Sequence, residues 1–370
     1  MDCVPTPDRP NIGSLTQLVG PLAKNLVWRA AYSKWPLATE RDLSPGYTVL
    51  MPVPADLPVF VRLAIANIAA QDPSGRREIL IIPDRQDLEV AGAVAASRAE
   101  TGLRDLRLVA LPPLSQAFGR LARSDPATNY FLQLHAGVKE CATTHALLHD
   151  ADLLLTDAHF LARHYKRCAE RGLACLGVSP AWDTWLREHG FNHVVATWEM
   201  IFDVRWMTWF APWRHRAHFG WLDGQWHGCD VTLCTQAKTA PRLCDLHPAA
   251  DTSFVHFNWV IGTYRHFQRS TSGPMDDSHF NLLLIRLLVD ALDGRLSRLR
   301  RVPVGVPPAD ELARGLTDPR QRVTYSSAEA ASNYASFREK VRRLYEGPLF
   351  DGAAIGAIEQ RLAPFDAAFG

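Results

Sequence analysis

The sequence lacks an excess of charge of either sign. It holds 40 lysines and arginines against 39 aspartates and glutamates, which gives a formal net charge of +1 over 370 residues. Proteins that bind nucleic acids through the phosphate backbone need a clear basic excess, usually gathered on one face or in one stretch. The composition therefore argues against nucleic acid as a partner.

Long apolar runs are also missing. No stretch approaches the roughly 18 apolar residues that a membrane-spanning helix requires. The richest run, 280–292, is interrupted by Arg286 and Asp290 and is expected to be a packed helix. The first residues, Met1–Pro7, carry an acid and two prolines where a secretory signal places basic residues and then an apolar run. We therefore expect a soluble, cytoplasmic protein without a transmembrane segment.

Cysteine is sparse, and its spacing fits neither a disulfide framework nor a zinc site. The seven cysteines are scattered over the chain without a Cys-x-x-Cys pair. Soft ligands do gather between residues 227 and 247, but the intervals between these cysteines are too long for a typical structural zinc site. Glycine-rich dinucleotide loops, Walker-type loops and Gly-x-Ser-x-Gly are absent as well. These absences argue against a Rossmann dehydrogenase in particular.

What is present is an alternation of apolar, β-rich runs with helical patterns. Strands are expected at 47–53, 78–84, 106–111, 146–155 (split by a polar knot) and 174–178, and helices at 58–70, 88–101, 131–143 and 156–171. This order predicts an α/β fold in which helices cover both faces of a mostly parallel sheet.

Changes in composition suggest three parts. Residues 1–45 are expected to form an N-terminal arm with short helices, 46–270 a ligand-binding domain, and 271–370 a helical region. Helices are expected there at 280–292, 309–316, 328–345 and 352–362. The C-terminal helices would form either a lid or a homodimer surface.

Polar residues follow the predicted strands at the edge where parallel sheets bind ligands. Asp150 and Asp152 stand two residues apart inside an apolar run, and two such carboxylates need a compensating cation if they are buried. Mg²⁺ and Mn²⁺ prefer oxygen ligands and often share them with a diphosphate. Asp84 ends the second strand, where it can accept a hydrogen bond from a base or cap a turn.

Two further residues have a chemical and a structural interpretation. His256, in an apolar β-like segment, is either a third metal ligand or a buried core histidine. Glu199, among large apolar residues, is either a general base with a raised pKa or an acid at a helix N-terminus paired with Arg205.

Most of the eleven tryptophans fall in an irregular segment between residues 182 and 226. They predict either an aromatic core or an acceptor cleft in which flat side chains stack on rings, and the two interpretations are compatible. Trp206 and Trp221 are the candidates for acceptor contact.

Taken in order, these segments resemble the GT-A glycosyltransferases, particularly family 2-like members. The matching pieces, all between about residues 45 and 180, are Met51-Pro52-Val53-Pro54, Ala70-Gln71, Ile81-Ile82-Pro83-Asp84, His135-Ala136-Gly137-Val138 and Leu148-His149-Asp150-Ala151-Asp152. The resemblance implies a GT-A-type fold. It also implies transfer of a sugar from a nucleoside-diphosphate sugar, usually UDP-linked, to a small-molecule or glycan acceptor.

By the same resemblance, Pro52, Val53 and Asp84 border the nucleoside, and Lys139 is placed in this donor-binding set. Asp150 and Asp152 would hold Mn²⁺ or Mg²⁺ on the diphosphate, with His256 as the third ligand.

The sequence departs from the family in two places. The second strand ends in Pro-Asp-Arg without paired acids, and the Glu-Asp pair that marks an inverting base is missing. Glu199 is the first candidate for that base and Asp230 the second, while a retaining enzyme would need none. The alternatives are a sugar-phosphate nucleotidyltransferase and a non-catalytic nucleotide-sugar-binding protein.

Overall fold

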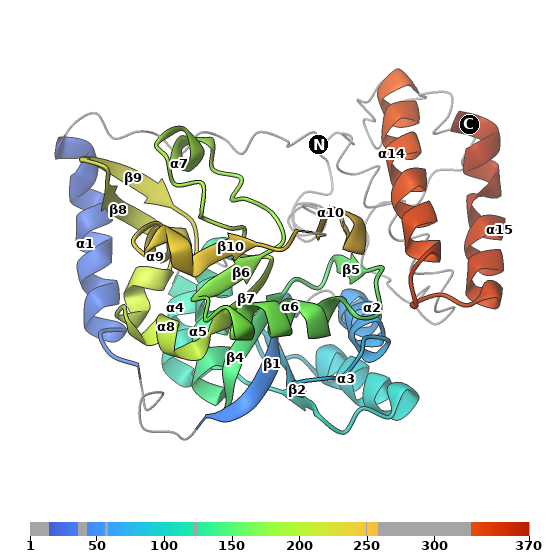
Figure 1. Ribbon diagram of the computed structural model, residues 1–370, viewed down its shortest axis with the longest axis horizontal. Helices are drawn as coiled ribbons and strands as arrows, with labels where there is room; N and C mark the ends of the chain where they lie inside the picture. The colour runs from blue at the N-terminus through green and yellow to red at the C-terminus, as the bar shows by residue number, and fades with distance from the viewer. Residues whose placement is uncertain are drawn as a thin grey trace. The chain divides into compact units, whose positions relative to one another are not determined.

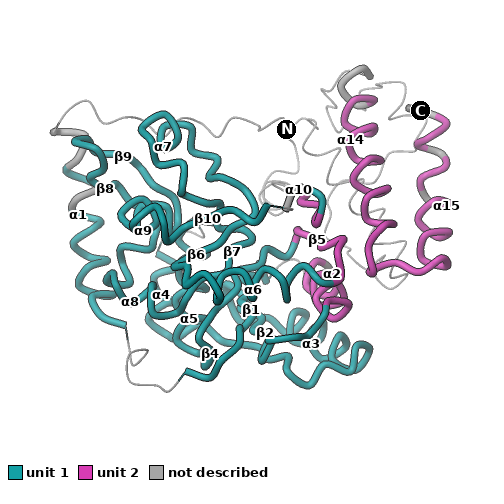
Figure 2. Tube along the Cα trace, in the orientation of Figure 1, with its two compact units in different colours: residues 1–58, 72–151, 159–252 teal, residues 59–71, 152–158, 253–370 magenta. Residues whose placement is uncertain are grey.

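A computed structural model describes residues 15–35, 43–55, 58–121, 125–248, 250–257 and 327–369. The chain divides into two compact units, shown in teal and magenta in Figure 2. Unit 1 comprises residues 1–58, 72–151 and 159–252, and unit 2 comprises 59–71, 152–158 and 253–370. Both units are therefore discontinuous in the sequence.

Unit 1 contains a seven-stranded sheet with the order β10-β6-β7-β4-β1-β2-β3 (Figure 1). Its strands are β1 (Ser44–Val53), β2 (Arg76–Pro83), β3 (Leu106–Leu108), β4 (Thr143–His149), β6 (Cys175–Gly177), β7 (Glu199–Asp203) and β10 (Cys244–Leu246). All pairings are parallel except those of β7, which runs antiparallel to β4 and β6. The prediction of an α/β fold with a mostly parallel sheet is confirmed, and the arrangement is consistent with a GT-A-type fold.

The central strands are buried along most of their length, which indicates that both faces of the sheet are covered. Residues 46–53 of β1 are all buried, as expected for a parallel strand between two helical layers. On one face, Leu50 and Leu148 belong to the same hydrophobic core as Phe131 of α5 (Pro126–Glu140) and Trp28 of α1 (Leu15–Ala31). A Cβ atom on Gly137 of α5 would lie 2.6 Å from Cδ1 of Ile82, so a larger residue there would force the Ile82 side chain to shift.

The other elements of unit 1 are α3 (Leu88–Thr101), α4 (Pro113–Leu121), α6 (Phe160–Glu170), α7 (Thr184–Glu188), α8 (Val204–Thr208), α9 (Leu233–Ala237), 3-10 helices at Pro212–His215 and Pro241–Leu243, and the hairpin of β8 (His218–Leu222) and β9 (Gln225–Cys229). Within this region Trp206 is completely buried, and its ring N–H donates to Thr239 Oγ1 at 2.8 Å. Trp221, by contrast, is 52% exposed. Trp206 is thus a core residue rather than an acceptor contact, whereas Trp221 remains accessible.

Unit 2 contains α2 (Pro58–Ala69), α14 (Ser327–Tyr345), α15 (Gly352–Phe369) and an antiparallel pair formed by β5 (Leu153–Leu155) and β11 (Phe254–His256). Asn67 of α2 fastens the end of β5, since its side chain hydrogen-bonds both the N–H and the C=O of Leu155. The short helix α10 (Ala250–Ser253) immediately precedes β11. The helices predicted at 280–292 and 309–316 lie outside the described residues.

The prediction of a single strand at 146–155, interrupted by polar residues, is wrong in one respect. β4 and β5 belong to different sheets, because the chain turns at Asp150–Asp152 and, within the described part of the chain, β5 pairs with β11 alone. Among the described helices, none is long and apolar enough to cross a bilayer.

Candidate metal and nucleotide site

The two predicted metal-binding aspartates lie in the turn that follows β4, next to the central strand β1. The main-chain N–H of Asp150 donates to the carbonyl of Trp198 at 2.9 Å, which fastens this turn to the residue before β7. Asp152 is only 5% exposed, and Asp150 is partly exposed. The carboxyl end of β4 therefore presents two acids separated by one buried alanine.

His256 reaches Asp152 through the pairing of β11 with β5. His256 lies opposite Leu153 in that ladder, one residue beyond Asp152. The N–H of Phe257 donates to the carbonyl of Asp152 at 3.0 Å, and Nε2 of His256 lies 3.3 Å from Oδ1 of Asp152. Main-chain hydrogen bonds thus hold a histidine beside an aspartate more than a hundred positions earlier in the sequence.

Asp150, Asp152 and His256 each offer one ligand atom, and these atoms all lie within 4.8 Å of one another. Two carboxylates and an imidazole form a donor set that suits Mn²⁺, since manganese accepts hard oxygen ligands and one nitrogen. No other group of three such ligands occurs among the described residues, so the soft ligands at 227–247 form no zinc cluster there.

Tyr130 of α5 orients the exposed member of the aspartate pair. Its hydroxyl lies 3.0 Å from Oδ1 of Asp150 and 3.1 Å from the carbonyl of Thr197. Burial, and then the negative charge of Asp150, raise the pKa of Tyr130 well above its ordinary value. The hydroxyl therefore stays protonated as a hydrogen-bond donor. Tyr130 could not be predicted from the sequence, because nothing in the helical pattern around it marks it as a partner of the turn after β4.

Replacing Tyr130 by phenylalanine is expected to weaken metal binding without unfolding the protein. Outer-shell partners of metal ligands typically contribute about 10- to 100-fold in affinity, and Phe keeps the ring while removing only the donor to Asp150. Mn²⁺ titration followed by calorimetry measures the effect, with Tyr165→Phe on α6 as the matched control. Unchanged Mn²⁺ affinity in Tyr130→Phe would show that the hydroxyl does not orient Asp150.

Glu199 is the first residue of β7 and has no exposed surface. It lies opposite His149 in the β4–β7 ladder, and its Oε2 is 2.5 Å from Nδ1 of His149, which is equally buried. Neither a helix start nor a pair with Arg205 is found here; the N-cap of α8 is Asp203. In this position Glu199 supports the strand that carries Asp150 and presents no surface to an acceptor.

Asp230, the second candidate base, directly follows β9 and is partly exposed. Its charge contributes to the raised pKa of Tyr130, as do those of Asp150 and Glu199, so it belongs to the same acidic neighbourhood. Its Oδ1 accepts the N–H of Val231 at 2.7 Å.

The residues expected to bind the nucleoside also lie close together. The N–H of Asp84 donates to the carbonyl of Val53 at 3.1 Å, and Oδ1 of Asp84 accepts the N–H of Ala55 at 3.0 Å. Pro52 and Val53 are buried at the end of β1. Gln133 of α5 adds a hydrogen bond to the Val53 carbonyl at 2.8 Å. The ends of β1 and β2 thus form one hydrogen-bonded rim.

Lys139 is not brought to this rim. It lies in the last turn of α5, just before β4 begins at Thr143, and so at the amino-terminal edge of the sheet. Asp84 and Asp150 follow strands at the opposite, carboxyl-terminal edge. The position of Lys139 gives no support to a donor contact.

No protein-family model matches the sequence, and no curated protein sequence matches it. Among solved structures, similar ones include a mannosyltransferase from Pyrobaculum calidifontis in complex with GDP-Man and Mn²⁺ (13% identity, 88% of this chain and 97% of that one, TM-score 0.39). Others are residues 1–349 of S. aureus TarS in complex with UDP-GlcNAc (10% identity, 88% and 82%, TM-score 0.35) and core-mannan synthase A from Aspergillus fumigatus in an Mn/GDP form (10% identity, 46% and 64%, TM-score 0.30). At these values the likeness carries no argument about activity, which has to rest on the site itself.

Proposed function

We propose that the protein is a metal-dependent glycosyltransferase that moves a sugar from a nucleoside-diphosphate sugar to a small-molecule or glycan acceptor. The observation that carries the proposal is the convergence of Asp150, Asp152 and His256 within 4.8 Å, immediately after the central strand β4. Open α/β sheets bind their ligands at this edge of the strands.

Asp150, Asp152 and His256 would hold Mn²⁺ or Mg²⁺. An ion bound there supplies positive charge that offsets the negative charge developing on a diphosphate leaving group. Lys340 of α14 is partly buried and interacts electrostatically with Asp152. It was not among the residues expected at the site. It is a second source of positive charge near Asp152.

The rim formed by Pro52, Val53 and Asp84 is the proposed contact with the nucleoside, uridine being the first choice. The hydrogen bonds from the main chain to Asp84 and from Asp84 to Val53 keep this rim rigid before any ligand arrives. A preformed rim lowers the ordering cost of binding.

For an inverting reaction, Asp230 is the stronger candidate for the general base. A base has to reach the acceptor hydroxyl within hydrogen-bonding distance. Asp230 is partly exposed, whereas Glu199 is fully buried and bound to His149. The acceptor would lie against the accessible part of the tryptophan-rich segment, where Trp221 forms an edge-to-face pair with Trp226.

A sugar-phosphate nucleotidyltransferase is the less favoured alternative. Such enzymes usually carry a Gly-rich, basic loop after the first strand, and here β1 ends in Pro52-Val53 and continues with Pro54-Ala55. A non-catalytic nucleotide-sugar-binding protein would share the binding site and differ only in turnover.

Calorimetric titration of the metal-free protein with UDP and with GDP, each with and without Mn²⁺, tests the proposal. We expect one of the two nucleotides to bind only when Mn²⁺ is present, because the carboxylates repel a bare diphosphate. Donor hydrolysis or transfer then separates an enzyme from a binding protein. Failure of every nucleoside diphosphate to bind in the presence of Mn²⁺ would exclude the proposed function.

A further inference from the structure

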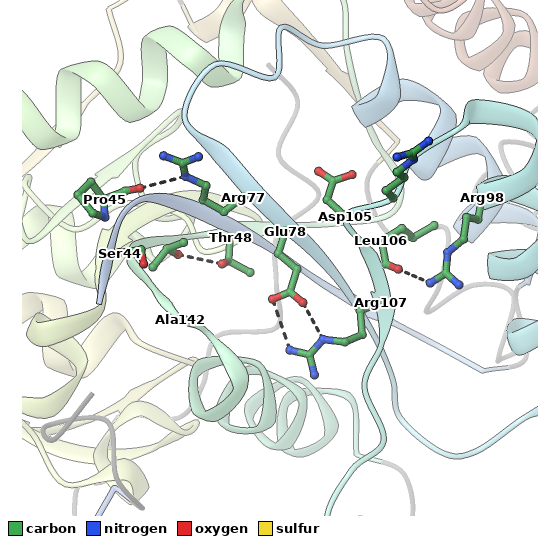
Figure 3. A pocket seen from close by; sticks show the side chains of 12 residues that line it. Ser44, Pro45, Thr48, Arg77, Glu78, Arg98, Asp105, Leu106, Arg107 and Ala142 are labelled. Atoms are coloured by element: carbon green, nitrogen blue, oxygen red, sulfur yellow. Dashed lines mark hydrogen bonds and ion pairs between the residues drawn. The ribbon is translucent and has the colours of Figure 1, made fainter. Parts of the chain in front are cut away.

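An open cavity of ≈ 960 Å³ lies in unit 1, at the amino-terminal edge of the sheet (Figure 3). It is lined by the first residues of β1, β2 and β4, by β3 with the residues before it, and by the last turn of α3. Its volume falls within the range of about 300–1,000 Å³ that is typical of small-molecule sites. No pattern in the sequence predicts this cavity.

Four of the residues that line this cavity are arginines: Arg77, Arg98, Arg104 and Arg107. The formal net charge of the whole protein is only +1, so the cavity is a local concentration of positive charge. In Figure 3 the labelled arginines come from different elements, Arg77 from β2, Arg98 from α3 and Arg107 from β3.

The two acids of the cavity are both ion-paired. Glu78 accepts from Nε of Arg107 at 2.7 Å, and Nη1 of Arg107 also meets Glu140 at 3.0 Å. Asp105 pairs at 3.0 Å with Arg76, which lies just outside the lining. Because Arg107 is shared by Glu78 and Glu140, these ion-paired groups keep one negative charge, which the remaining three arginines of the lining outnumber.

Among the described residues, no carboxylate forms an ion pair with Arg77, Arg98 or Arg104, and all three are exposed. Arg77 donates Nε to the carbonyl of Pro45 at 3.2 Å, and Arg98 donates to the carbonyl of Leu106. A guanidinium has five N–H donors, so these single contacts orient each side chain and leave most of its donors for a ligand.

We infer that this cavity is a binding site for a phosphate-bearing ligand. Planar guanidinium groups match phosphate oxygens with paired, charge-assisted hydrogen bonds, which makes arginine the preferred partner of phosphate. Two of the guanidiniums are held in place by main-chain carbonyls, which reduces the entropy lost on binding. The phosphate belongs either to a soluble molecule or to a lipid headgroup.

The cavity is separate from the metal and nucleotide site. It lies where the parallel strands begin, and the site of Asp84 and Asp150 lies where they end, so the length of β1 and β4 stands between them. The inference therefore does not depend on the proposed glycosyltransferase activity, and either can fail alone.

Titration of the full-length protein with inorganic pyrophosphate, in EDTA so that no divalent metal is present, tests the inference. The double variant Arg77→Gln/Arg104→Gln is expected to weaken binding by about tenfold or more, because it removes two charged donors. Arg187→Gln/Arg205→Gln is the matched control. It removes the same charge from exposed arginines of α7 and α8, outside the cavity lining.

A second arm uses phosphatidylcholine vesicles with and without phosphatidic acid. Binding to the phosphatidic acid vesicles alone, lost in Arg77→Gln/Arg104→Gln and kept in the control, would support the site and assign the phosphate to a lipid headgroup. Absence of binding to both probes would overturn the inference, as would equal weakening in the cavity variant and the control.

Discussion

Asp152→Asn is expected to reduce metal-dependent turnover by at least about 100-fold, the upper end of what even outer-shell partners of a metal contribute. Asparagine keeps the size of the side chain but removes the charge that would bind the cation. Asp152 is the buried member of the pair and lies 3.3 Å from His256, so its loss affects two of the three proposed ligands at once. Donor hydrolysis or transfer, measured across a range of Mn²⁺ concentrations, gives the result.

The matched control is Asp223→Asn in the β8–β9 hairpin. Asp223 is exposed and has a φ of 44°, a conformation that asparagine tolerates well. This variant loses the same charge and should keep full activity and Mn²⁺ affinity. If Asp152→Asn also kept its Mn²⁺ dependence and turnover, the metal site would have to lie elsewhere.

Glu199→Ala is expected to lower the free energy of unfolding by about 1–3 kcal/mol, the cost of leaving a buried hydrogen-bonding group without its partner. Both Glu199 and His149 are fully buried, and the variant would leave the His149 ring without its partner at the end of the β4–β7 ladder. Urea denaturation followed by circular dichroism measures the change. Glu188→Ala, at an exposed position of α7, should change stability little.

The same variant separates the two interpretations of Glu199. A folded, stable Glu199→Ala protein that has lost turnover with its nucleotide affinity intact would restore Glu199 as the catalytic base. Loss of stability with residual turnover in the folded fraction would leave Asp230 as the candidate.

Much of the parallel sheet could be predicted because its strands are buried on both faces. The apolar run predicted at 47–53 forms β1, and the helix predicted at 88–101 matches α3 at both ends. The boundaries of α3 are set by neighbouring residues in the sequence. Asp87 caps the first turn, and Gly102, with a φ of 69°, ends the last. Such signals need no tertiary information.

The second half of the sheet could be predicted only in part. The strand expected at 174–178 matches β6, whereas no strand is expected at β7 or β10, which have five and three residues. The burial of Glu199 depends on its pairing with His149, fifty positions away, which no local pattern records. The Asp150–Asp152 pair could be recognised in the sequence because the two residues are almost adjacent. The hydrogen bond from Tyr130 to Asp150 could not, because it joins residues on different elements.

The reversed direction of β7 affects how such a protein can diversify. β6 ends and β7 begins at the same edge of the sheet, so residues 178–198 leave and re-enter it beside the turn at Asp150. Both ends of this segment are anchored on neighbouring strands, and Ala181, Leu186 and Val194 of its interior pack with residues of β8, β9 and α9 in a hydrophobic cluster of their own. A related chain could therefore exchange or lengthen this segment together with its own cluster, while the strand that leads into the two aspartates stays unchanged.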